Sequence, residues 1–157
     1  MYNKIVFLTR KNFFYVDFKL HDSFSNRIYL ILFHLCFILV DLKNKRNDKN
    51  DQQAIFDCFF KQIELNFREL GYGDITVNKK MKNLIWLFYE ILIKCKNWKQ
   101  LQNDSKNNIL LNYFSNNYDN KILSNNLTNY FDKFSFFIED ISLNSITKGV
   151  FRYVYEE

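Results

Sequence analysis

The three cysteines are the most reactive side chains in this sequence, and their spacing argues against a shared site. Cys36, Cys58 and Cys95 lie roughly 20 to 40 residues apart, so no two of them have the short spacing of a metal-ligand pair. Each also lies among apolar residues in the sequence. We therefore expect three small, buried hydrophobic side chains in a reducing compartment, and no metal site.

The two histidines do not indicate a catalytic base. His34 lies inside residues 28–40, a run of 13 residues that is otherwise apolar. We expect this imidazole to be buried and hydrogen-bonded to a neighbour. His21 lies in a polar segment, and we assign no role to it. Because histidine, cysteine and carboxylate side chains do not cluster, the sequence predicts a protein that is not an enzyme and holds no cofactor.

Charged side chains are dense around two of the three glycines of the chain, Gly71 and Gly73. Glu69 and Asp74 flank this pair and could be paired carboxylates. A helix cap accounts for Asp74, however, and an ion pair with Arg68 or a lysine accounts for Glu69. The Gly-x-Gly pair lacks the Lys-Ser/Thr of a phosphate-binding loop and follows a helical pattern, not a strand, so we expect no nucleotide site.

The same glycines predict a turn between two helices. The apolar periodicity of the first helix ends at Leu70, and Gly71 can adopt the left-handed conformation that a side chain would penalise. Gly73 provides a second pivot. We expect Asp74, or Thr76, to cap the next helix by accepting a hydrogen bond from its free N–H groups.

Lysines crowd the first turns of that second helix, where the helix dipole favours negative charge. Lys79 and Lys82 share one face of the helix, Lys80 lies beside them, and Arg68 is near across the turn. Two interpretations have similar weight: a solvated charged face, or a surface for an anionic partner. A DNA-binding helix would have to be exposed. The apolar pattern of this helix predicts burial, so we expect no DNA partner.

This stretch resembles the signature of the ubiquinol–cytochrome c chaperone family, the assembly factors of the cytochrome bc1 complex. The family pattern is Arg-Glu-(Leu/Met)-Gly-x-Gly-Asp-x-x-Val-x-Lys-x-(Val/Met)-Lys. The positions that match it in order are Arg68, Glu69, Leu70, Gly71, Gly73, Asp74, Val77, Lys79, Met81 and Lys82. Nearer the N-terminus, the further matches are Arg10, Phe14, Tyr15, Asp22, Arg27 and His34. Beyond residue 112 only helix spacing and a Gly-x-Phe-Arg agree.

The apolar periodicity predicts an all-α protein, a single-domain bundle of about five to six helices over residues 1–157. The absence of proline and the presence of only three glycines favour long helices. We expect helices at about 2–15, 24–43, 51–70, 74–101, 109–114 and 127–141. The helix at 2–15 is predicted from the resemblance, because the apolar run in this segment also permits a strand. Asp22 or Ser23 should cap the second. Polar loops are expected at 43–51, 102–108 and 115–126, and a short aromatic tail at 150–155.

Two of these helices should form most of the core. The apolar run at 28–40 is shorter than the roughly 20 residues that span a bilayer, so it predicts a buried core helix. In the helix that begins near Asp74, Trp86, Tyr89 and Ile93 make a second side apolar, which predicts a central helix packed on several sides. Aromatic residues make up 19% of the chain, so we expect some rings to line a partner surface.

The resemblance implies a function. It implies a chaperone for assembly of the cytochrome bc1 complex (respiratory chain complex III) that binds newly made cytochrome b. Mitochondrial relatives act with a small partner subunit and near the ribosome. Because their N-terminal extension has no counterpart here, we expect a bacterial protein, either peripheral on the cytoplasmic face of the inner membrane or cytoplasmic. The net charge of +5, with the basic excess in residues 1–100, suits an anionic partner such as lipid headgroups or RNA.

The candidate partner-binding residues are Arg68, Gly71, Gly73, Asp74, Lys79 and Lys82. The alternative function is that of a peripheral lipid- or quinone-binding helical module without chaperone activity. Vesicle binding in the absence of any partner would favour that alternative.

Overall fold

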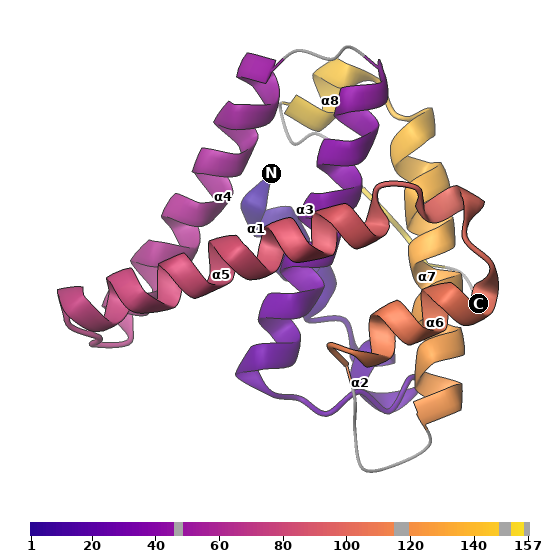
Figure 1. Cartoon of the computed structure of the whole chain (residues 1–157), viewed down its shortest axis with the longest axis horizontal. Helices are drawn as coiled ribbons and strands as arrows, with labels where there is room; N and C mark the ends of the chain where they lie inside the picture. Colours follow the sequence, from indigo (N-terminus) through magenta and orange to yellow (C-terminus); the bar gives the residue numbers. More distant parts are fainter. Residues whose placement is uncertain (46–48, 115–119, 148–151, 156–157) are drawn as a thin grey trace.

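The computed structural model describes residues 1–45, 49–114, 120–147 and 152–155, and every regular element in these ranges is a helix (Figure 1). The all-α prediction is confirmed. The predicted number of five to six helices is wrong, because these ranges contain eight α-helices and one short 3-10 helix. They are α1 (Tyr2–Thr9), α2 (Asn12–Val16), α3 (Phe24–Lys45), α4 (Lys49–Glu69), α5 (Asp74–Cys95), the 3-10 helix (Trp98–Gln100), α6 (Asn103–Leu111), α7 (Asn120–Asp140) and α8 (Leu143–Thr147).

The helix predicted at 2–15 is divided into α1 and α2, because Lys11 adopts an extended conformation between them. The start of α3 agrees with prediction: the backbone N–H of Asn26 donates to Ser23 Oγ at 3.2 Å. The loop predicted at 43–51 is too long, since α3 reaches Lys45 and α4 begins at Lys49. Residues 46–48, 115–119 and 148–151 lie outside the described part of the chain.

Two asparagine-rich segments that were predicted as loops are helical. Helix α6 occupies most of residues 102–108, and α7 begins seven residues earlier than predicted. Lys106 Nζ donates to both carboxylate oxygens of Asp132, at 2.9 and 3.0 Å. Thr128 Oγ1 donates to the Asn107 side chain at 2.6 Å. These contacts join α6 to α7 and outweigh the low helix propensity of asparagine.

Helix α3 is the central helix of the protein. It packs against α1, α4, α5, α7 and α8, and Figure 1 shows α5 crossing in front of it with α4 and α7 on either side. The prediction that the helix beginning near Asp74 is central is wrong. Helix α5 packs chiefly against α3 and α4, and its buried side chains are Val77, Phe88, Ile91 and Cys95.

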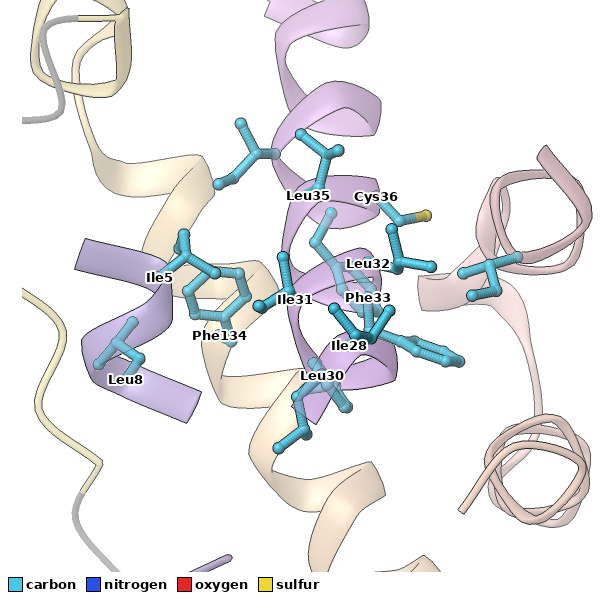
Figure 2. Close-up of a cluster of buried hydrophobic side chains, with 14 of the residues drawn as sticks. Ile5, Leu8, Ile28, Leu30, Ile31, Leu32, Phe33, Leu35, Cys36 and Phe134 are labelled. Carbon is cyan, nitrogen blue, oxygen red and sulfur yellow. The ribbon is translucent and has the colours of Figure 1, made fainter. Parts of the chain in front are cut away.

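Helix α3 is buried on all of its sides. Every side chain from Leu30 to Leu39 is buried, and Figure 2 shows the side chains of α3 directed toward neighbouring helices on different sides, with Ile5 and Phe134 near Ile31. Among the described helices, α3 is the one long and apolar enough to cross a membrane, with a mean hydropathy of 1.6 over an 18-residue window. That window is 72% buried inside the fold. The prediction of a buried core helix is therefore confirmed.

His34 occupies the middle of this helix and is fully buried, as predicted. Its Nδ1 lies 2.6 Å from the Leu30 carbonyl oxygen and its Nε2 lies 2.7 Å from Tyr130 Oη on α7. Because a carbonyl oxygen can only accept, Nδ1 donates to Leu30 and Nε2 accepts from the tyrosine hydroxyl. Burial lowers the pKa of His34 to about 4, so the imidazole is neutral at pH 7.

The cysteines are divided between core and surface. Cys36 on α3 and Cys95 on α5 are buried, as predicted, but Cys58 on α4 is exposed. The prediction for Cys58 is wrong because α4 packs through one face only, the face that carries Phe59 and Ile63.

Candidate functional site

The turn between α4 and α5 has the predicted glycine conformation. Gly71 has a φ of 85°, and its N–H donates to the Arg68 carbonyl at 2.9 Å. Gly73 is extended, with a φ of −69°, and precedes the first residue of α5. Leu70, which was predicted on the buried face of α4, is 61% exposed because α4 ends one residue earlier.

Replacing Gly71 by alanine should therefore lower the free energy of unfolding by about 1 kcal/mol, because a side chain at this positive φ is strained. No neighbouring atom lies within 4 Å of a Cβ placed at Gly71 or at Gly73. A difference in unfolding free energy between substitutions at the two positions therefore comes from backbone strain and not from steric contact. The matched control is Gly73→Ser, which suits an extended N-cap. Urea unfolding followed by circular dichroism measures both variants, and an unchanged midpoint for Gly71→Ala would contradict the expectation.

The predicted cap at the start of α5 is wrong. The N-cap residue is Gly73, and no side chain caps the helix there. The Asp74 carboxylate instead accepts a hydrogen bond from Arg68 Nη1. Arg68 also donates through Nε and Nη2 to Glu64 Oε1, at 3.0 and 2.8 Å. These carboxylates raise the pKa of the Arg68 guanidinium and offset its charge.

The three lysines of α5 differ in their surroundings. Lys80 is half-buried, with its Nζ 4.8 Å from the centre of the Tyr72 ring and 5.7 Å from that of Phe67. This arrangement is a cation–π contact that links the glycine turn to α5. Lys79 and Lys82 are exposed on one side of α5, as their spacing predicts. Arg68 is therefore ion-paired, whereas no such pair involves Lys79 or Lys82 among the described residues.

Apolar side chains share that side of α5 with the lysines. Residues that are spaced alternately four and three positions apart lie on one face of a helix, and a set of exposed side chains on α5 has this spacing. We call this set the α5 face; its members are Ile75, Lys79, Lys82, Trp86, Tyr89, Ile93 and Lys96. Ile75, Trp86 and Ile93 are 88%, 70% and 77% exposed. Large apolar side chains so exposed in one row are typical of an interaction surface.

The α5 face carries uncompensated positive charge. The two acidic residues of α5 are engaged elsewhere: Asp74 with Arg68, and Glu90 with Lys94, at 2.5 Å. Lys94 and a hydrogen bond from Tyr113 hold the pKa of Glu90 below its usual value. Within the described residues, no carboxylate pairs with Lys79 or Lys82.

A groove continues the α5 face toward α3 and α4. It has a volume of about 470 Å³, and Tyr89, Ile93 and Lys96 of the α5 face form one wall. Phe56 and Leu92 also line it, and no acidic residue of the described ranges does so. The groove extends the combination of apolar surface and positive charge beyond α5 itself.

Reasoning from the sequence missed the apolar half of this face. The predicted burial of a second side of this helix, with Trp86, Tyr89 and Ile93, is wrong. The argument against a DNA partner relied on that burial and therefore does not hold. The 3–4 spacing that joins Lys79 and Lys82 to Trp86 could have identified the face. Among the described residues, no group of three or more histidine, cysteine or carboxylate side chains could hold a metal ion.

Comparison with known proteins gives two similarities. A family model described as ubiquinol-cytochrome C chaperone matches residues 16–105, which include α3, α4, the glycine turn and α5. The crystal structure of the Cbp3 homolog from Brucella abortus superposes with a TM-score of 0.78 at 24% sequence identity, covering 98% of this chain and 86% of the other. At this identity, the superposition shows a shared fold. No curated protein sequence matches the chain.

Proposed function

Because this chain belongs to the ubiquinol–cytochrome c chaperone family, we propose that it is a chaperone for assembly of the cytochrome bc1 complex. Its client is newly made cytochrome b, which it binds as a peripheral protein at the cytoplasmic face of the inner membrane. Residues 1–157 act as one chaperone domain. The protein works by binding its client and catalyses no reaction.

The observation that supports this proposal is the α5 face. Membrane helices awaiting assembly are apolar, and they end near anionic lipid headgroups. Ile75, Trp86 and Ile93 offer apolar contact area to such a helix, and Lys79 and Lys82 can reach carboxylates or phosphates at its end. An exposed face that combines both kinds of side chain fits a client held at the membrane surface.

The residues predicted from the signature have two roles in this proposal. Lys79 and Lys82 contact the partner directly. Arg68 and Asp74 bridge α4 to the start of α5, and Gly71 and Gly73 set the path of the chain between the two helices. These four residues thus position the lysines.

The test is replacement of the gene by one that encodes Lys79→Glu together with Lys82→Glu. We expect the amount of assembled bc1 complex in membranes to fall, with cytochrome b lost first, as measured by haem b spectra. Both lysines are exposed, so the variant should lose less than about 0.5 kcal/mol of stability and accumulate normally. The glutamates also suit the start of a helix.

The matched control reverses two exposed lysines elsewhere, Lys61 on α4 and Lys121 at the start of α7. It should support normal bc1 content, because the net charge change is the same and the α5 face is intact. A variant Trp86→Gln tests the apolar half of the face in the same assay. If the lysine variant accumulates and supports full bc1 content, then the lysines form only a solvated face.

The alternative is a peripheral lipid- or quinone-binding module, and one observation favours it: tryptophan and lysine on one exposed helix face are typical of helices at a membrane interface. Flotation with anionic vesicles in the absence of any partner distinguishes the two. Tight binding to vesicles together with normal bc1 content in the lysine variant would favour the module. Binding to a small partner subunit and to the ribosome remains a prediction, which co-purification would test.

A further inference from the structure

A second cavity lies away from the α5 face, where the C-terminal segment 152–155 meets α1 and α2. Its volume is about 550 Å³, which is in the range of small-molecule sites. The residues that line it are Lys4, Phe7, Leu8, Lys11, Phe13, Arg152, Tyr153, Val154 and Tyr155. The proposed chaperone function uses none of them.

Among the described residues, the charge of this lining has one sign. Lys4, Lys11 and Arg152 are exposed, and no acidic residue of the described ranges lines the cavity. Lys11 Nζ lies 4.4 Å from the centre of the Phe7 ring, a cation–π contact that holds one of the charges beside the cavity. Three positive side chains around one cavity favour an anionic group in it.

The rest of the lining is apolar. Phe7 and Val154 are 63% and 60% exposed. The Phe13 and Tyr155 rings also line the cavity and pack against each other, with their centres 5.1 Å apart. Tyr153, also part of the wall, has a buried hydroxyl without a hydrogen-bond partner in the described part of the chain. An occupant with an apolar chain would cover Phe7 and Val154, which the fold leaves open to water.

We propose that this cavity binds a single-chain anionic amphiphile of the fatty-acid class. The acyl chain lies against Phe7, Phe13 and Val154, and the carboxylate lies among Lys4, Lys11 and Arg152. The proposal does not depend on the α5 face or on the chaperone function, and either can fail without the other.

Titration calorimetry with monomeric decanoate tests this site in the full chain. Decanoate should bind with a stoichiometry of one, whereas acetate, which has the head group alone, and 1-octanol, which has an uncharged chain, should bind at least tenfold more weakly. The triple variant Lys4→Gln, Lys11→Gln, Arg152→Gln should weaken decanoate binding by roughly tenfold or more, since each exposed charge contributes modestly. Val154→Glu, which adds a negative charge at an exposed position, should weaken it as well.

The matched control removes three exposed charges outside the cavity, with Lys61→Gln, Lys99→Gln and Lys121→Gln. It should bind decanoate within about twofold of the unchanged protein. Circular dichroism establishes that each variant is folded. The proposal is overturned if the control weakens binding as much as the cavity variant. It is also overturned if acetate binds as tightly as decanoate, or if the folded protein binds anionic vesicles but not monomeric decanoate.

Discussion

Replacing Phe131 by alanine should lower the free energy of unfolding by about 3–5 kcal/mol, a large share of the total stability of a domain of this size. Phe131 is fully buried on α7. The centre of its ring lies 5.4 Å from that of Phe33 and 5.3 Å from that of Phe37, both on α3. Alanine would leave a cavity between α3 and α7 that rigid neighbouring rings cannot fill. Urea unfolding at constant pH measures the change.

The matched control is Phe136→Ala on the same helix. Phe136 is 58% exposed, and Lys99 Nζ lies 5.0 Å from the centre of its ring. Loss of this exposed contact should cost less than about 1 kcal/mol. Similar losses for the two variants would contradict the burial pattern of α7.

Acidification should destabilise the protein through His34 by about 3 kcal/mol between pH 6.5 and pH 4. Burial lowers the pKa of His34 in the folded protein to about 4, whereas an unfolded chain has a histidine pKa near 6.5. The unfolded state therefore binds the proton first as the pH falls. The stability that depends on neutral His34 is complete above pH 6.5 and is lost progressively down to pH 4.

Unfolding midpoints in urea measured at steps between pH 7 and pH 4.5 test this expectation. The window avoids most of the carboxylates whose pKa values are lowered by ion pairs, such as Glu90 and Glu139, because their stabilisation is lost only at more acidic pH. The control is the double variant His34→Phe, Tyr130→Phe, which removes both partners of the buried hydrogen bond. Its stability should change little over the same window, and an equally steep loss in the control would assign the effect to other groups.

Local sequence pattern determined the helical class and several particular features of this protein. The spacing of apolar residues located both ends of α3 and α4 and the start of α5 to within two residues, because one turn of a helix is set by neighbouring residues. The predicted end at 101 was wrong, since α5 ends at Cys95 and a separate 3-10 helix follows. The lack of a side chain at Gly71 predicted its left-handed conformation, and the apolar neighbours of His34 predicted its burial. The glycine-turn signature indicated the family.

The tertiary structure alone decided which apolar faces are covered. Periodicity shows that Trp86 and Ile93 lie on a common side of α5, but it does not show whether another helix packs there. Helix α3 takes the centre and is covered on all sides, so α5 lies at the surface and presents Trp86 and Ile93 to solvent. The helix of the Lys106 segment likewise depends on Asp132, which is 26 residues distant. Contacts between residues so far apart in the chain are absent from any local pattern, and they decided where the candidate partner-binding face lies.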